Sequence, residues 1–233
     1  MHPTKKTARV AGLLYLLMGI PATFSMVYIP RTLIVLGNAT ATANNILASE
    51  MLFRIGIVSE LIFATAFIFL VRALYRLLNG VNKTHASLMV TLALVSVPIS
   101  FLNVLNEIAA LALLRGAAFL SVFEKRQLDA LAMVFLGLHR YGFLVDAIFW
   151  GLWLFPFGVL VIKSGFIPRI TGVLLIVGCF AWLAVSLTSL LLPSYLNVVT
   201  RLATLPQAAA ELPIMLWLLI KGAKVQPLDD PAS

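Results

Sequence analysis

Long apolar stretches, separated by short polar links, occupy the chain almost from end to end. The two apolar runs on either side of Lys163–Arg169 are each long enough to cross a bilayer, which requires about 20 apolar residues. The same pattern recurs along the chain and predicts membrane-spanning helices at about residues 10–36, 51–78, 86–114, 134–162, 170–192 and 205–220. We therefore expect an all-α fold, namely a six-helix transmembrane bundle.

The first long link covers residues 37–50 and is rich in small polar residues without a cation. This composition predicts an outer loop, in which Thr40 or Thr42 caps the helix that follows. Glu50 and Arg54 are four residues apart, so they can form an ion pair on that helix.

Two later links also carry signals. Ser121–Glu124 fits a capping box, which predicts a short interfacial helix between spans 3 and 4. Residues 193–204 are expected to form the last outer loop. We expect residues 1–225 to form a single integral membrane domain and residues 226–233 to form a polar tail.

Composition strengthens this interpretation. Hydrophobic residues make up 61% of the 233 residues and charged residues only 11%, whereas soluble domains carry roughly 25% charged residues. A soluble fold could not bury this much apolar surface, so the lipid bilayer is the predicted partner. The net charge of +8 is spread over the ends of apolar spans without a basic run, so no nucleic acid is expected.

The distribution of cations predicts the orientation, because cytoplasmic links carry an excess of Lys and Arg. With the N-terminus inside, the cytoplasmic side receives ten of the 17 cations: Lys5, Lys6, Arg9, Arg72, Arg76, Lys83, Lys163, Arg169, Lys221 and Lys224. This bias predicts that both termini are cytoplasmic, which agrees with an even number of spans.

Several segments resemble a known family. They are GNATATANNILASEMLFRIGI (residues 37–57), FWGLWLFPFGVLVIKSGFIPRITGVLL (149–175), ARVAGLLYLL (8–17), RALYRLL (72–78) and GLHRYGF (137–143). They are similar to an uncharacterised bacterial family of multi-pass membrane proteins, domain-of-unknown-function family 4386. The resemblance implies about six helices and a location in the bacterial plasma (inner) membrane. It implies no activity and no functional residues.

Ionisable side chains inside the spans are the main functional signal, because a charge at the bilayer centre costs at least about 2.5 to 3.5 kcal/mol. At about 1.5 Å per residue from the nearest cytoplasmic cation, Glu60 and Glu211 are expected near mid-bilayer, with Asp146 higher. Glu107 and Asn103 share one face toward the outer end of their helix. Four helices therefore direct polar groups into the outer half of the bundle.

These positions predict a water-accessible pocket that opens to the outer side. The candidate ligand-binding residues are Arg54, Glu60, Asn103, Glu107, His139, Arg140, Asp146 and Glu211. The acids outnumber the cations at depth, so either some carboxyl groups are neutral or a cation binds among them. The alternative is that pairs such as Arg54–Glu107 or Arg140–Glu211 only hold helices together, since inter-helix polar contacts average about 0.6 kcal/mol.

Sequence motifs of common catalytic chemistry are missing: the chain contains no HExxH, GxSxG, Walker A or GxGxxG motif. His139 is the one histidine expected within a span, whereas the usual catalytic zinc sites use two or three, so we predict no metal site and no cofactor. We favour a protein that binds or transports a small, cationic or amphipathic molecule over an enzyme. The alternatives are an intramembrane lipid-modifying enzyme, with Glu107 or His139 as general base, and a structural or accessory protein without a ligand.

Overall fold

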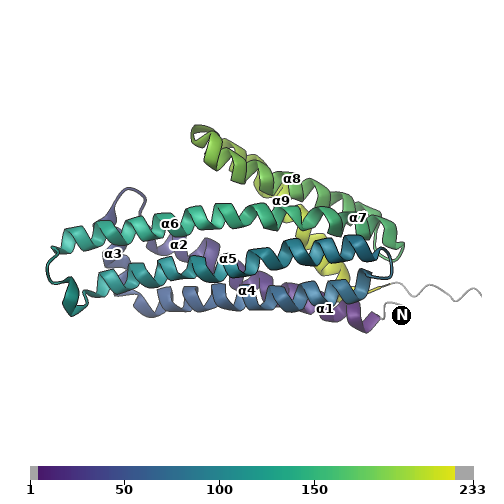
Figure 1. The fold of residues 1–233 in the computed structure, drawn as a ribbon, viewed down its shortest axis with the longest axis horizontal. Coiled ribbons are helices and arrows are strands. Elements are labelled where there is room, and N and C mark those ends of the chain that lie inside the picture. The colour runs from purple at the N-terminus through teal and green to yellow at the C-terminus, as the bar shows by residue number, and fades with distance from the viewer. Residues whose placement is uncertain (1–4, 224–233) are drawn as a thin grey trace, which may run out of the picture. The chain divides into compact units, whose positions relative to one another are not determined.

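The computed structural model describes residues 5–223, and in this range the chain consists of helices and short turns, without a strand (Figure 1). The helices that are long and apolar enough to cross a membrane number six in this range: Lys5–Leu33, Glu50–Leu78, Lys83–Arg115, Lys125–Ser164, Arg169–Leu191 and Pro193–Ile220. The all-α prediction with six spanning helices is therefore confirmed. The predicted polar tail at residues 226–233 lies outside the described residues.

The chain divides into two compact units, each built from separate segments of sequence. The first unit comprises Met1–Leu16, Ile68–Leu94 and Ala147–Ser233, and the second comprises Leu17–Phe67 and Val95–Asp146. Four long helices contribute one part to each unit. The expectation of a single domain over residues 1–225 stays a prediction.

The first span changes its helical form between two prolines. Helix α1 (Lys5–Thr23) contains Pro21 and continues through the π-helical turn η1 (Phe24–Tyr28) into α2 (Ile29–Leu33), which has Pro30 in its first turn. Proline has no N–H to donate to the carbonyl four residues earlier, so the regular ladder is interrupted at each site. The wider π-turn between them keeps the span helical, as is common for such bulges.

The segment expected as a polar loop is instead largely helical. Helix α3 (Ala39–Ala48) begins after Asn38, whose Oδ1 accepts a hydrogen bond of 2.9 Å from the Ala41 N–H. The hydroxyl of Thr42 bonds to the backbone of Val35 rather than capping the helix. Asparagine is among the strongest N-cap residues, which explains why the helix begins here.

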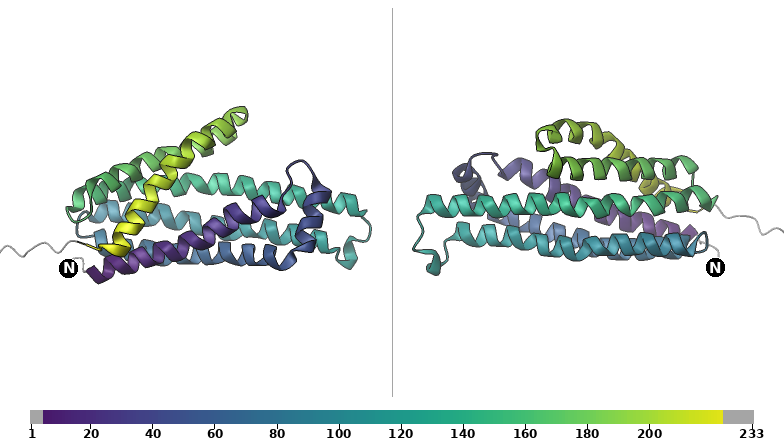
Figure 2. Two further views of the ribbon diagram at one scale, coloured as in Figure 1. Left: turned by 180° about the vertical axis from the view of Figure 1, so that it is seen from behind. Right: turned by 45° about the horizontal axis from the view of Figure 1, so that its top comes forward.

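Three long helices follow: α4 (Glu50–Leu78), α5 (Lys83–Arg115) and α6 (Lys125–Leu152). Short turns join successive helices of this group (Figures 1 and 2). In the second unit, a core of large apolar side chains packs between these helices, α2 and α3. It contains Ile29, Leu33, Ile46, Phe53, Ile57, Val104, Leu111 and Leu136.

The predicted interfacial helix differs from the observed structure. Only the three-residue 3-10 helix η2 (Ala118–Leu120) separates α5 from α6, and the helix expected to begin at Ser121 begins at Lys125 as the first turn of α6. The side chain of Gln127 accepts a hydrogen bond of 2.9 Å from the Glu124 N–H. This is the reciprocal half of a capping box, placed three residues later than predicted.

The last three helices belong to the first unit: α7 (Leu154–Ser164), α8 (Arg169–Leu191) and α9 (Leu196–Ile220). Helix α8 packs against both α7 and α9 (Figure 2). Most of residues 193–204, expected as a loop, forms the 3-10 helix η3 (Pro193–Tyr195) and the start of α9. The prolines inside α9 do not end it, because neighbouring helices help to satisfy the freed backbone groups in membrane proteins.

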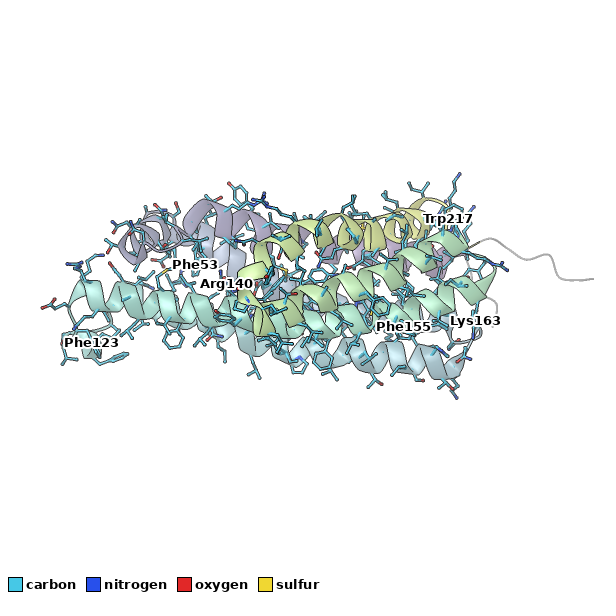
Figure 3. The ribbon with its side chains drawn as sticks, turned by 90° about the horizontal axis from the view of Figure 1, so that it is seen from above. Phe53, Phe123, Arg140, Phe155, Lys163 and Trp217 are labelled. Carbon is cyan, nitrogen blue, oxygen red and sulfur yellow. The ribbon has the colours of Figure 1, made fainter. Side chains whose placement is uncertain are left out.

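Two glycines allow α7 and α8 to approach closely. A Cβ atom on Gly158 would lie 2.6 Å from the Gly172 carbonyl oxygen, and one on Gly172 would lie 2.7 Å from the Gly158 carbonyl oxygen. Small residues at helix interfaces let backbones meet in this way when both helices are in lipid. The exposed side chain of Lys163 lies at the end of α7, beside the turn that joins the pair (Figure 3).

Candidate functional site

Three of the predicted residues converge in the second unit, each from a different helix. They are Glu60 of α4, Glu107 of α5 and His139 of α6, and we call them the Glu–Glu–His cluster. One carboxylate oxygen or imidazole nitrogen from each residue lies within 4.8 Å of the others. The Nε2 atom of His139 is 3.0 Å from Oε2 of Glu60.

The cluster is buried. Glu60 and Glu107 are 6% and 7% exposed, and the His139 side chain is 16% exposed. Among the described residues, Oε2 of Glu107 has no hydrogen-bond partner. A buried carboxylate oxygen without a partner costs free energy. A hydrogen-bond donor or a cation bound to this oxygen would therefore stabilise the protein.

Asn103 fixes the helix that carries the histidine. Its side-chain N–H donates a hydrogen bond of 2.9 Å to the backbone carbonyl of His139, and its own Oδ1 accepts from Asn106 at 3.3 Å. Gly142, one turn further along α6, lies directly against the Asn103 side chain, where any Cβ would collide. The close approach of α5 and α6 at Gly142 thus lets an amide on one helix hold the backbone of the other.

The cluster lies far from the turn between α4 and α5. Glu60 is 18 residues from the end of α4 at Leu78, and Glu107 is 24 residues from the start of α5 at Lys83. At about 1.5 Å per residue, these are about 27 and 36 Å of helix. Both glutamates therefore lie in the half of their helix that is farther from this turn.

Asp146 belongs to the same unit but has a contact of its own. Its Oδ2 accepts a hydrogen bond from the Ser100 hydroxyl across α5 and α6, while its Oδ1 has no partner among the described residues. The sequence analysis did not predict that Ser100 is the hydrogen-bond donor to Asp146. The spacing could have indicated it, because Ser100 lies three residues before Asn103 and so on the same side of α5.

Glu211 lies in the first unit, where Tyr15 of α1 donates a hydrogen bond of 2.7 Å to its Oε2. Tyr15 is only 2% exposed. The indole N–H of Trp182 is near the same carboxylate but does not reach hydrogen-bond geometry. Sequence reasoning also missed Tyr15, and the interaction matches the alternative in which a carboxylate joins helices.

The two predicted arginines have other partners. Arg54 pairs with Glu50 at 2.7 Å, as its spacing predicted, and its side chain is 43% exposed. Arg140 is exposed and its guanidinium lies 5.5 Å from the ring centre of Tyr141 (Figure 3). Neither arginine forms an ion pair with Glu107 in the described part of the chain, so the Arg54–Glu107 pair is not formed.

An all-helical chain with six apolar helices and a buried polar cluster is a multi-pass membrane protein of the helical class. The chain belongs to the family described as a domain of unknown function, DUF4386, which matches residues 10–222. The resemblance noted in the sequence is therefore confirmed. No curated protein and no solved structure matches the chain.

Proposed function

We propose that this protein binds a small cation at the Glu–Glu–His cluster, within a bacterial plasma membrane. The observation that carries the proposal is the convergence of two buried carboxylates, from α4 and α5, on one imidazole from α6. No Lys or Arg of the described chain pairs with Glu60 or Glu107. When both carboxyl groups are ionised, they and at most one imidazolium leave an excess of negative charge.

An uncompensated charge away from water is strongly unfavourable, and charged groups inside membrane spans mark ion or substrate sites by default. A cation bound among the three side chains would offset this charge. The free oxygen of Glu107 provides an acceptor for it.

The position of the cluster supports entry from one side of the membrane. It lies in the half of α4 and of α5 that is farther from the turn joining them. With both termini cytoplasmic, that half of each span faces the outside of the cell. The proposed role is thus to take a cation from the outer side, for binding or for transport.

Ligand-dependent thermal stability of the purified full-length protein in detergent tests this proposal. The probes are Na⁺, K⁺, Mg²⁺, Mn²⁺, Zn²⁺, choline and spermidine, each with wild type, Glu60→Gln and Glu107→Gln. At a concentration 100 times its Kd, a bound cation stabilises the folded state by about 2.7 kcal/mol. We expect at least one probe to raise the Tm of wild type and to have less effect on both variants.

Glu124→Gln is the matched control, because this glutamate is exposed and its side chain lies outside the cluster. It should respond as wild type does. If no probe stabilises the wild type, or if both cluster variants respond like the control, the proposal is wrong. Uptake of the stabilising cation into proteoliposomes then separates transport from binding alone.

A further inference from the structure

We infer that the cation is a divalent transition-metal ion of the zinc class, held by Glu60, Glu107 and His139. This inference rests on the proposed function and names the ligand class of the same site. The sequence did not suggest it, because only one histidine was expected in the spans. The structure adds two carboxylates from other helices to that histidine.

The charge of the cluster favours a divalent ion. Two carboxylates carry two negative charges, and a neutral imidazole adds none. A monovalent cation would leave a net charge in a medium of low polarity, where an unpaired charge is most costly. A divalent ion neutralises both carboxylates, which are each more than nine-tenths buried.

The donor atoms favour a transition metal over Mg²⁺ or Ca²⁺. Both of those ions prefer sets of oxygen ligands, whereas imidazole nitrogen suits Zn²⁺ and its neighbours in the first transition series. Two carboxylate oxygens and one nitrogen are three protein ligands, a number that leaves one tetrahedral position for water or another ligand.

The geometry needs only a small adjustment. Ligand atoms about 2.1 Å from a tetrahedral metal lie roughly 3.4 Å from one another. The Glu60–His139 contact is 3.0 Å, and all three ligand atoms lie within 4.8 Å. Rotation of the carboxylate groups can supply a change of up to about 1.4 Å in these distances, and Oε2 of Glu107 has no hydrogen bond to lose. The metal takes the place of the hydrogen bond between His139 and Glu60, because a coordinating imidazole nitrogen carries no proton.

The surroundings also suit a metal ligand set. Metal-binding residues are commonly held by partners outside the ligand set, and the Asn103 side chain holds the backbone of His139 across the α5–α6 interface. Arg54, the nearest cation in sequence to Glu60, is already paired with Glu50. No described lysine or arginine therefore competes for the two carboxylates.

The direct test is metal content. Tag-free, full-length protein in detergent is dialysed against micromolar Zn²⁺ and, separately, Co²⁺, and then analysed for bound metal and for affinity. We expect about one ion per chain for wild type and at least a tenfold weaker affinity for Glu107→Gln, since even the loss of an outer partner costs about 10- to 100-fold. Glu211→Gln is the control, because its carboxylate bonds to Tyr15 in the first unit, and it should bind as wild type.

A second variant keeps the test decisive if Glu107→Gln does not fold. With His139→Cys, a thiolate replaces the imidazole, and bound Co²⁺ should then show thiolate-to-cobalt charge-transfer absorption in the near ultraviolet. Both proteins are made in a Cys179→Ser background, so that residue 139 is the one cysteine of the variant and protein with His139 should lack this band. A bound Co²⁺ without this band in His139→Cys would show that residue 139 is not a ligand.

The outcomes separate the two proposals. If wild type retains neither metal, or if Glu107→Gln retains it as wild type does, the metal assignment is wrong. If another probe, such as Na⁺ or choline, still protects wild type through Glu60 and Glu107, the cation-binding function stands without the metal. If no cation of either kind binds, both proposals fail.

Discussion

Asp146 and Glu211 each accept a hydrogen bond from a hydroxyl on another helix, Ser100 in one case and Tyr15 in the other. Glu107 and Asp146 each keep one buried oxygen without a partner in the described residues, but only Glu107 lies in the Glu–Glu–His cluster. The eight candidate residues therefore fall into three groups. Three form the Glu–Glu–His cluster, four (Arg54, Asn103, Asp146 and Glu211) bond to other residues, and Arg140 is exposed. Sequence reasoning found the acids but not their partners, because a hydroxyl in an apolar helix is too common to be a signal.

A double-mutant cycle at Tyr15 and Glu211 tests the interpretation of this pair as a helix contact. Tyr15→Phe leaves the carboxylate without its donor, so we expect a loss of about 1 kcal/mol in the free energy of unfolding. Replacing both partners in Tyr15→Phe/Glu211→Leu should recover part of that loss, since no polar atom is left unpaired. Thermal unfolding in detergent measures the effect, and a double variant less stable than the sum of the two single changes would contradict this interpretation.

At the scale of helices, the spans agreed well with the hydrophobic pattern but their ends did not. Helix α3 and the first turns of α9 formed where polar composition predicted loops. Asn38 caps α3. Helix α9 continues through Pro206 toward its N-terminal end, which membrane helices tolerate because neighbouring helices can satisfy freed backbone groups. Helix ends depend on such individual contacts, whereas span centres depend on average polarity.

We predict that the close approach of Gly158 and Gly172 is needed for the stability of the α7–α8 pair. Gly158→Ala and Gly172→Ala each place a Cβ under 3 Å from a backbone carbonyl oxygen, so each should destabilise the protein by about 1 to 3 kcal/mol. Gly137→Ala is the control, because no described atom lies within 4 Å of its added Cβ, and alanine favours a helix by up to about 1 kcal/mol. Equal Tm values for all three variants would argue against close packing of α7 on α8.

For the whole molecule, the prediction that remains open is orientation. The cation bias places both termini and the turn at Lys163 in the cytoplasm, and an even number of spans then places Glu124 outside. In a Cys179→Ser background, Glu124→Cys should react with a membrane-impermeant maleimide in intact cells, and Lys163→Cys should react only after lysis. The reverse pattern would invert the topology, and labelling of both sites in intact cells would contradict the spans assigned to residues 125–164.

The sequence by itself determined that this protein is helical, that it carries six apolar spans and which family it belongs to. These properties follow from average polarity and local order along the chain, so each can be recognised without contacts between distant residues. Only the tertiary structure decided which of the deep acids share a site. Glu60, Glu107 and His139 are widely separated in sequence, and their convergence depends on the rotation and register of three packed helices. Hydrophobic periodicity does not determine these two quantities, because lipid is as apolar as the side chains between helices and so weakens the contrast between the faces of a span.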